Sequence, residues 1–421
     1  MSVVQKLRHS QFLLHNTVFF LGSVAVGALN YLYYPVLGRL LEPRAFGEVQ
    51  TLVSLFLQLT VFLTVLSMVI VNIVANQSDE TKRNGLIFEF EKLALWISAA
   101  LLAASIIFGK QLQHWLNFGS PWPFAVLMVA ILVSVPFILR GAYLRGLQRF
   151  GMVSSGNILA AGGKLVLSAI LVAAGLGTLG AIGGVAASQV VACALILWWA
   201  RRLGLERPHT SKKISHPNLK LLAPELRFGG VVLAASLAIT LQYSVDIIFI
   251  KHYFDPNTAG LYAGVAAVAR ILFFLTASVA QVLMSKIKLD GRGHDNHRML
   301  EKSLFLLGAI SLPVLAVMIL LPTQVINLLM GSGYQEMANL LPILSTSVFI
   351  VSVINLLATY YLSLRRYGVA AIAVLGAAFT YFLILMHHSS PEAVVSSLLW
   401  GSAATLAVLG GWKITERRYG V

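Results

Sequence analysis

Charged side chains inside long apolar stretches are the residues of this sequence that could do chemistry. Lys164, Asp246 and Arg270 each lie within a run of apolar residues. A base at the centre of a membrane helix costs about 2.5 to 3.5 kcal/mol on insertion scales, so each must face water, a ligand or a partner. Lysine and arginine suit phosphate oxygens, whereas an aspartate can pair with a base or carry a proton.

Lys164 belongs to a stripe of small and polar residues. Asn157, Ala161, Lys164 and Ser168 are spaced at i, i+4, i+7 and i+11, which places them on one face of a helix. If this face lines a wet cavity, Asn157 and Ser168 are further candidates for binding a polar ligand. The alternative is that Lys164 snorkels or pairs structurally with a neighbouring helix.

Asp246 lies one helical turn after Gln242 and is the one acidic residue that we expect deep in a span. It could form an ion pair with Arg270 or Lys164, or it could carry a coupling proton. We therefore take Asp246, Gln242 and Arg270 as the candidate site residues of the second half, and both roles of Asp246 stay open.

Motifs of enzymatic chemistry are missing from the sequence. It has no Walker A sequence, no G-x-S-x-G, no H-E-x-x-H and no dinucleotide fingerprint. Its histidines show no metal-ligand spacing, and the single cysteine, Cys193, excludes an internal disulfide. We expect no catalytic residue, no metal and no cofactor; a coupling ion, proton or sodium, is left undecided.

Composition identifies the class of protein. The chain of 421 residues is 58% hydrophobic and 11% charged, with a mean hydropathy of +0.81. Apolar stretches of about 17 to 25 residues, each long enough to span a bilayer as a helix, follow one another almost without interruption. The net charge of +15 is explained by bases between spans, so it does not indicate a nucleic-acid partner.

The apolar stretches predict about twelve spans. The third is expected after a polar connector over Gln77 to Lys92, the fourth ends at Arg140, and the longest polar connector covers Arg201 to Lys220. The predicted spans are 12–36, 48–75, 93–108, 123–140, 153–175, 178–200, 228–250, 260–284, 303–321, 341–362, 369–386 and 394–411.

Basic residues predict the orientation, because short cytoplasmic loops hold an excess of Lys and Arg. The segments on the side of the N-terminus hold 24 of the 31 bases. The opposite side holds four, namely Arg39, Arg44, Lys110 and Lys251. We therefore expect both termini in the cytoplasm and the protein in the inner (cytoplasmic) membrane.

Two phrases recur at nearly the same offset. Leu41-Glu42-Pro43 with Gly47 returns as Phe254-Asp255-Pro256 with Gly260, 213 positions later. The second phrase returns 217 positions later, with Tyr143, Leu147, Arg149, Phe150 and Gly151 recurring as Tyr360, Leu364, Arg366, Tyr367 and Gly368. Six spans separate the copies, so the repeat is parallel. It predicts an N-terminal lobe, 1–222, with spans 1 to 6 and the basic linker 201–222, and a C-terminal lobe, 223–421, with spans 7 to 12.

The chain resembles the polysaccharide-transporter branch of the MOP superfamily, the oligosaccharide flippases related to multidrug MATE exporters. The residues that carry the resemblance are Gly38-Arg39-Leu40-Leu41-Glu42-Pro43 with Gly47, Arg145-Gly146-Leu147-Gln148-Arg149-Phe150-Gly151, and Asp246-Ile247-Ile248-Phe249-Ile250 followed by Gly260-Leu261-Tyr262. The resemblance implies an all-α membrane protein with two six-helix lobes around a cavity that opens alternately to either side. It implies transport of lipid-linked sugar, often undecaprenyl-diphosphate-linked, to the outer leaflet.

Two other functions remain open at this point. One is a cation-coupled exporter of small drugs, and the other is a membrane scaffold that organises glycan-assembly enzymes. Exporters of organic cations favour acids in the cavity, whereas Lys164 and Arg270 suit a diphosphate, so charge favours the flippase. Expected partners are a lipid-linked glycan, membrane lipids and a glycan polymerase or assembly enzymes.

Overall fold

The computed structural model describes residues 3–77, 79–205, 219–287 and 293–419, and these residues contain helices and no strand. The helices of the first half are α1 (Val3–Leu40), α2 (Pro43–Asn76), α3 (Glu80–Ile107), α4 (Gly109–Trp115), α5 (Trp122–Gly146), α6 (Phe150–Leu171) and α7 (Gly177–Arg202), with the π-helical turn η1 (Val172–Leu176) between the last two.

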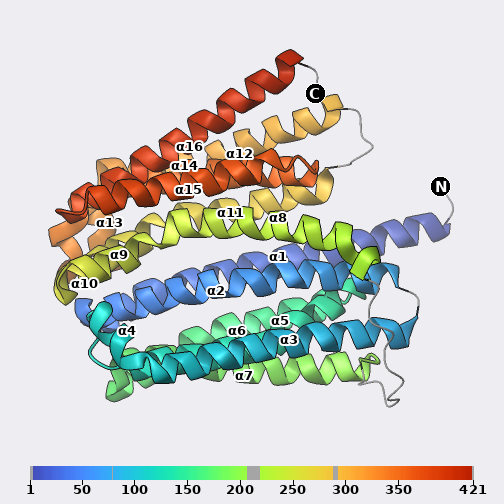
Figure 1. Cartoon of the computed structure of the whole chain (residues 1–421), viewed down its shortest axis with the longest axis horizontal. Coiled ribbons are helices and arrows are strands. Elements are labelled where there is room, and N and C mark those ends of the chain that lie inside the picture. The colour runs from blue at the N-terminus through green and yellow to red at the C-terminus, as the bar shows by residue number, and fades with distance from the viewer. Residues whose placement is uncertain (1–2, 78, 206–218, 288–292, 420–421) are drawn as a thin grey trace. The chain divides into compact units, whose positions relative to one another are not determined.

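The second half has the same all-helical character (Figure 1). Its elements are α8 (Leu219–Ser244), α9 (Asp246–Tyr253), α10 (Pro256–Ala269), α11 (Ile271–Lys286), α12 (Gly293–Leu320), α13 (Pro322–Leu329), the 3-10 helix η2 (Ser332–Leu340), α14 (Leu341–Ser363), α15 (Gly368–Met386) and α16 (Pro391–Tyr419).

The described helices account for the predicted spans. Nine are long and apolar enough to cross a membrane, and α8 with α9, bent by 47°, adds a tenth. One of the nine is the stretch Phe150–Arg202, which the positive φ angles of Gly175 (89°) and Gly177 (50°) divide into α6 and α7, two helices that pack side by side. With α1, the helices match the twelve predicted spans, so the expected all-α membrane fold is confirmed.

The chain forms two compact units. Unit 1 comprises residues 1–40, 59–114 and 119–229, and unit 2 comprises residues 41–58, 115–118 and 230–421. In unit 1, α6 packs on α1 and α7, and α5 packs on α3 and α7; in unit 2, α14 packs on α11, α12 and α16. The sequence-based lobe boundary at residue 222 stays a prediction.

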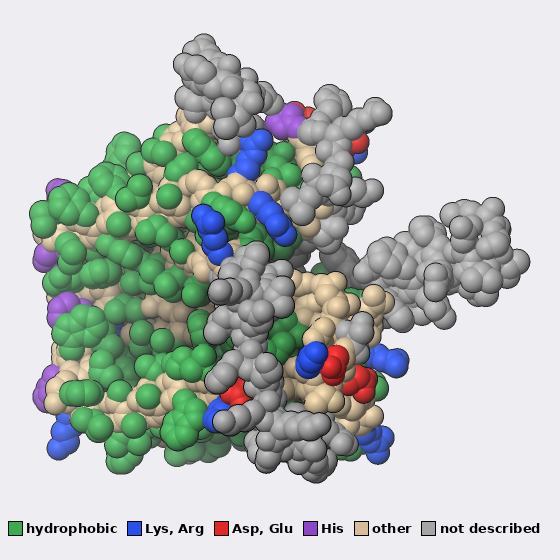
Figure 2. Space-filling view, turned by 45° about the vertical axis from the view of Figure 1, so that its right-hand side comes forward, with side chains coloured by type: hydrophobic (Ala, Val, Ile, Leu, Met, Phe, Trp, Pro, Cys, Tyr) green, Lys and Arg blue, Asp and Glu red, His purple; other side chains and the backbone are tan. Residues whose placement is uncertain are grey.

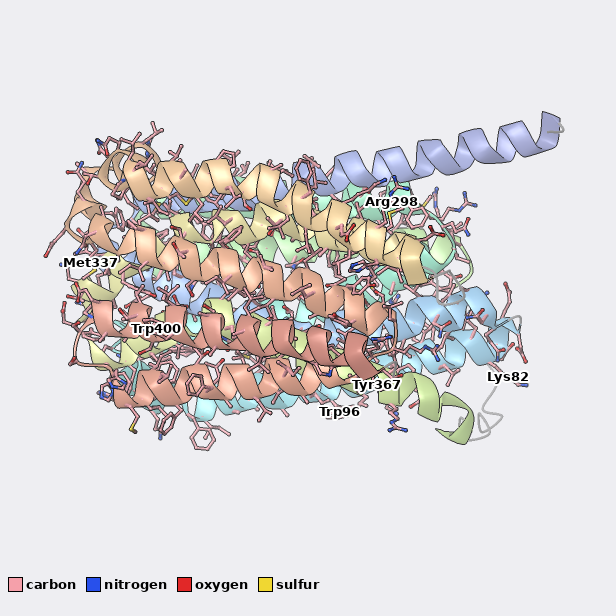
Figure 3. The ribbon with its side chains drawn as sticks, turned by 90° about the horizontal axis from the view of Figure 1, so that it is seen from above. Lys82, Trp96, Arg298, Met337, Tyr367 and Trp400 are labelled. Carbon is pink, nitrogen blue, oxygen red and sulfur yellow. The ribbon has the colours of Figure 1, made fainter. Side chains whose placement is uncertain are left out.

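Apolar side chains cover the flanks of these helices. On the face shown in Figure 2, hydrophobic side chains cover most of the described surface, and Lys and Arg side chains gather mainly toward its right-hand side. Trp96 and Trp400, both labelled in Figure 3, are each 68% exposed. In unit 2, Arg298 and Tyr367 lie toward one end of the helices and Met337 at the other (Figure 3). This pattern fits helices whose apolar flanks contact lipid and whose polar ends lie in water.

The polar connector predicted over Gln77 to Lys92 is wrong, because helix α3 already begins at Glu80. Asp79 accepts hydrogen bonds from the backbone N–H groups of Thr81 and Lys82, and this N-cap starts the helix well before the apolar stretch. The backbone N–H of Lys82 also holds the pKa of Asp79 below its ordinary value. The fourth span likewise continues past Arg140, since α5 ends at Gly146. Of the long connector, residues 206–218 lie outside the described residues.

Both copies of the second repeated phrase adopt the same backbone. At the end of α5, Gln148 has a φ of 59°, the Arg149 N–H donates to the Leu144 carbonyl, and the Gln148 N–H donates to the Arg145 carbonyl. At the end of α14, Arg365 has a φ of 56°. There the Arg366 N–H donates to the Tyr361 carbonyl, and the Arg365 N–H donates to the Leu362 carbonyl. These are two Schellman motifs with side chains where glycine is usual. The repeat seen in the sequence therefore extends to the backbone.

The two copies of the first repeated phrase meet in unit 2. Each places a proline at the first position of a helix, α2 or α10. The Phe46 N–H donates to the Glu42 carbonyl at 2.9 Å, and the Ala259 N–H donates to the Asp255 carbonyl at 3.0 Å. A Cβ on Gly47 would lie 2.9 Å from the Cα of Gly260, and one on Gly260 would overlap the carbonyl of Pro43. Both glycines are therefore needed for backbone-to-backbone contact between the turns.

Asp255 fixes the second of these turns. Its carboxylate accepts hydrogen bonds from the backbone N–H groups of Asn257 and Thr258, at 3.0 and 3.1 Å, at the N-terminus of α10. Hydrogen bonds from the side chain and backbone of Thr258 hold the pKa of Asp255 below its ordinary value. The turn is therefore capped by a charged carboxylate at neutral pH.

We predict that Gly260→Ala lowers the apparent unfolding temperature of the purified protein by several degrees, because forcing a methyl group into packed backbone costs about 1 to 3 kcal/mol. Gly151→Ala is the matched control, since a Cβ there meets nothing within 4 Å and alanine is the better helix former. Thermal unfolding monitored by size-exclusion chromatography measures both. Equal unfolding temperatures for the two variants would contradict the close contact of the turns.

Candidate functional site

Lys164 is a half-buried base held by two groups on α1. Its Nζ donates a hydrogen bond of 2.6 Å to Oδ1 of Asn30 and lies 4.4 Å from the centroid of the Tyr33 ring. Asn30 and Tyr33 are three residues apart, so they lie on one face of α1. The ammonium group is thus positioned by a neutral amide and an aromatic ring.

No carboxylate of the described residues lies within ion-pairing distance of Lys164. An amide oxygen and a ring face stabilise an ammonium group but leave its charge uncompensated. The part of unit 1 that surrounds Lys164 therefore keeps a net positive charge, which suits an anionic ligand. Sequence reasoning missed Asn30 and Tyr33, although both are polar side chains within the first predicted span and could have been chosen as candidates for that reason.

The other two candidates on α6 lie in different surroundings. Ser168 is fully buried, its hydroxyl donates to the Ala181 carbonyl at 2.7 Å, and a Cβ on Gly184 would overlap it. Ser168 therefore helps α6 pack on α7. Asn157 is half-buried on α6, two turns before Lys164. The role of both residues in ligand binding stays a prediction.

Asp246 and Arg270 form a buried ion pair. The Arg270 Nη2 donates to Oδ1 of Asp246 at 2.6 Å, and the Tyr262 hydroxyl donates to Oδ2 at 2.6 Å. Asp246 is 2% exposed and Arg270 is 7% exposed. Of the two roles that the sequence left open, the structure shows Asp246 paired; it brings the two charged candidates of the second half together.

Both charges lie where a helix is interrupted. Asp246 is the first residue of α9, where a carboxylate is favoured by the helix dipole, and Arg270 separates α10 from α11. The Arg270 Nε donates to the Tyr243 carbonyl at 2.9 Å, in the last turn of α8. Arg270 therefore satisfies a backbone group that the break releases from its helical partner. The ion pair links the two breaks.

Gln242, the remaining candidate, connects α8 to α16. Its Nε2 donates to the Thr405 hydroxyl at 3.3 Å, while its Oε1 is buried and has no hydrogen-bond partner among the described residues. Gln242, Asp246 and Arg270 lie in unit 2, whereas Asn157, Lys164 and Ser168 lie in unit 1.

A second buried ion pair was missed by sequence reasoning. Arg140 on α5 contacts Glu91 on α3, with its Nη2 2.9 Å and its Nε 3.2 Å from the two carboxylate oxygens. Glu91 is thus a further buried acid on a helix long and apolar enough to cross a membrane, besides Asp246. Glu91 was assigned to a connector because charges surround it in the sequence, but its partner is 49 residues away and allows burial.

The described residues hold no group of three or more His, Cys, Asp or Glu side chains that could bind a metal ion. Cys193 is buried on α7.

Removing one partner of the buried pair should destabilise unit 2. We predict that Asp246→Ala lowers the free energy of unfolding by about 3 to 5 kcal/mol, because the Arg270 charge is then buried without compensation. Lys82→Ala, which breaks an exposed pair with Asp79, is the control and should cost about 1 kcal/mol or less. Thermal unfolding in detergent compares them; equal unfolding temperatures would contradict a structural pair.

The model of the family described as polysaccharide biosynthesis protein matches residues 13–284. No curated protein matches the chain in sequence.

Several solved structures share the fold. The lipid II flippase MurJ in an inward closed conformation has a TM-score of 0.73 at 13% identity, covering 94% of this chain and 86% of that chain. An inward-facing MATE family multidrug resistance transporter of the MOP superfamily has a TM-score of 0.69 at 14% identity, covering 94% and 98%.

A third structure is a MOP superfamily transporter from Pyrococcus furiosus, described as having a binding pocket of reverse polarity. Its TM-score is 0.62 at 15% identity, covering 96% of this chain and 95% of that chain. These identities are low, so the likeness establishes the fold that this chain shares with these transporters, and nothing further. Since the family model covers well over half of the sequence, this chain belongs to the polysaccharide biosynthesis protein family.

Proposed function

We propose that this protein moves lipid-linked oligosaccharide or polysaccharide precursors, of the undecaprenyl-diphosphate type, across the cytoplasmic membrane by alternating access. Membership of the polysaccharide biosynthesis family and a fold shared with a lipid II flippase support this proposal. A coupled transporter needs no catalytic residue, and none is assigned here.

The environment of Lys164 is the observation that carries the proposal. Lys164 is a base at membrane depth, half-buried, oriented by Asn30 and Tyr33, and without a carboxylate within ion-pairing distance among the described residues. Where water is partly excluded, an ammonium group binds phosphate oxygens more strongly than in bulk solution. A diphosphate linker would supply the missing negative charge, and the amide of Asn157 could contact the sugar.

Arg270 enters the mechanism through Asp246. While Asp246 is ionised, both of its oxygens accept hydrogen bonds and Arg270 is neutralised. Binding of a proton or a sodium ion at Asp246 would weaken this pair and release the guanidinium group for the diphosphate. Coupling of ion and substrate would then follow from one shared residue, with Gln242 one turn away on α8.

Transport in this scheme requires only differential affinity. A ligand shifts a conformational equilibrium by as much as its affinity differs between the states, so substrate must bind the intermediate between the inward-open and outward-open states most tightly. The interrupted helices α8–α9 and α10–α11 offer places where such a change can occur, since helix breaks absorb changes in backbone angles.

A cation-coupled multidrug exporter is the second candidate, favoured by the similarity to MATE structures and by the buried acid Asp246. An exporter of organic cations needs an acid that is free to meet its substrate. Here Asp246 pairs with Arg270 and Glu91 pairs with Arg140, whereas Lys164 is uncompensated. The charge balance therefore favours the anionic substrate.

We predict that Lys164→Gln lowers glycan export by roughly tenfold or more, since a charge-assisted hydrogen bond contributes about 1.5 to 3 kcal/mol. Lys164→Arg should retain part of the export because the charge is kept. Export is measured as surface glycan in cells that have no other transporter for it. Lys110→Gln, at an exposed base of α4, is the control. Normal export by the Lys164→Gln protein at equal abundance would falsify the assignment.

The proposed location is the inner membrane with both termini in the cytoplasm, where a glycan polymerase or assembly enzymes could meet the transporter. In a Cys193→Ala background, a cysteine at Lys110 should react with an impermeant maleimide added to intact cells. A cysteine at Lys82 should react only after lysis. Both positions are exposed and lie at opposite ends of α3 and its continuation into α4. The reverse pattern would invert the topology.

A further inference from the structure

Unit 2 contains two segments that come from the first half of the sequence. Residues 41–58 form the turn before α2 and its start, and residues 115–118, which we call the connector, are the last residue of α4 and the three that follow it. Residues 41–58 contact α10 and η2 of the second half, and residues 115–118 contact α9. We call the contact of these segments with the second half the docking seam.

The first part of the docking seam is made by backbone and rings. Gly47 meets Gly260 without room for a side chain on either. The Phe46 ring packs edge-on against the Tyr334 ring, with 5.8 Å between centroids, and Tyr334 fills the space that a Cβ on Gly264 would need. These contacts involve no ion pair, so their strength comes from close packing.

The second part is the connector. The Asn117 side chain donates to the carbonyls of Lys251 and His252, at 3.3 and 3.4 Å. The His252 Nδ1 lies 2.7 Å from the Trp115 carbonyl, and the two rings are 4.7 Å apart. Phe118 is 5% exposed. The connector thus covers the end of α9.

Lys251 lies buried beneath this connector. Its side chain is 0% exposed, its Nζ has no hydrogen-bond partner among the described residues, and the Phe118 ring centroid is 5.4 Å away. The charges that act on it are Glu48, Arg44 and Asp255, but no carboxylate of the described residues lies within ion-pairing distance of its Nζ. Lys251 lies within α9, which ends at Tyr253, three residues beyond the predicted end of the seventh span.

A buried charge that makes no ion pair or hydrogen bond costs free energy that hydration would recover. The docked arrangement is thus stabilised by glycine and ring packing and destabilised by the ammonium group of Lys251. A packed seam with such a group is suited to opening, because separation hydrates the charge.

We propose that the docking seam is the gate on the face opposite the N-terminus, and that Lys251 sets its balance by disfavouring the closed state. This rests on the proposed function, in which the two halves must part on each face in turn. Opening separates Gly47 from Gly260 and lifts the connector from α9, so that Lys251 contacts water. Lys251 is a positioning residue that touches no substrate in this scheme.

The gate is tested by thiol labelling, which requires no substrate. A single cysteine replaces Leu116, a buried residue of the connector, in a Cys193→Ala background. Maleimide then reacts only when the seam opens. Lys251→Met nearly keeps the side-chain length and removes the charge, so labelling should slow by roughly tenfold or more, because a buried charge without a partner disfavours the closed state. Lys110→Met, an exposed lysine on the same side, should leave the rate unchanged.

An unchanged or faster rate in the Lys251→Met protein overturns the proposal. If that protein does not elute as a folded monodisperse species, Lys251→Gln is used, with the same slower rate expected and the same outcome overturning it. Unchanged labelling together with lost export in the Lys164→Gln protein rejects the gate and leaves the transport proposal standing. Slower labelling of the Lys251→Met protein, together with normal export by the Lys164→Gln protein, supports the gate and rejects the role of Lys164 in transport.

Crosslinking gives a second readout. The pair Trp115→Cys and His252→Cys joins the connector to α9, and the control pair Tyr253→Cys and His388→Cys joins two residues of the second half whose rings are 4.1 Å apart. A thiol crosslinker that joins the first pair should stop export, and cleavage of a reducible crosslinker should restore export. The control pair should not affect export. Continued export with the first pair fully crosslinked overturns the gate.

Discussion

The free energy of a charge in an apolar interior is the constraint on which this structure depends. Asp246 and Arg270 meet it by pairing, and the pair joins the start of α9 to the residue between α10 and α11. Glu91 and Arg140 meet it in the same way in unit 1. Lys164 and Lys251 have no carboxylate within ion-pairing distance among the described residues, and they carry the proposed ligand site and the proposed gate.

The two halves share a backbone but not a charge pattern. The Schellman motifs at Gln148 and Arg365 have the same hydrogen bonds, and both proline turns begin a helix with the same first backbone hydrogen bond. Each half has a buried ion pair, but Lys164 of the first half, beside Asn30 and Tyr33, has no carboxylate within ion-pairing distance among the described residues. A duplicated scaffold can keep its packing while its interior charges change, because packing depends on shape and small residues, whereas binding depends on a few charges.

The sequence by itself determined the class, the number of spans and the repeat. Long apolar stretches in lipid can satisfy their backbone groups only as helices, so composition and length sufficed. The offset between the Pro43 and Pro256 turns identified the duplication, and the family followed from the same residues. The start of α3 was misplaced because charged residues such as Glu91 resemble a loop until their partner is known.

Only the tertiary structure decided which charged groups meet. Spacing placed Asp246 near a base but could not choose between Lys164 and Arg270, because contacts between distant helices depend on helix rotation and bending, which local sequence does not set. The same holds for Asn30 beside Lys164 and for the burial of Lys251, whose cover is a connector more than 130 residues earlier. Local periodicity fixes which face of a helix a residue occupies; the fold fixes what that face touches, and with it the chemistry.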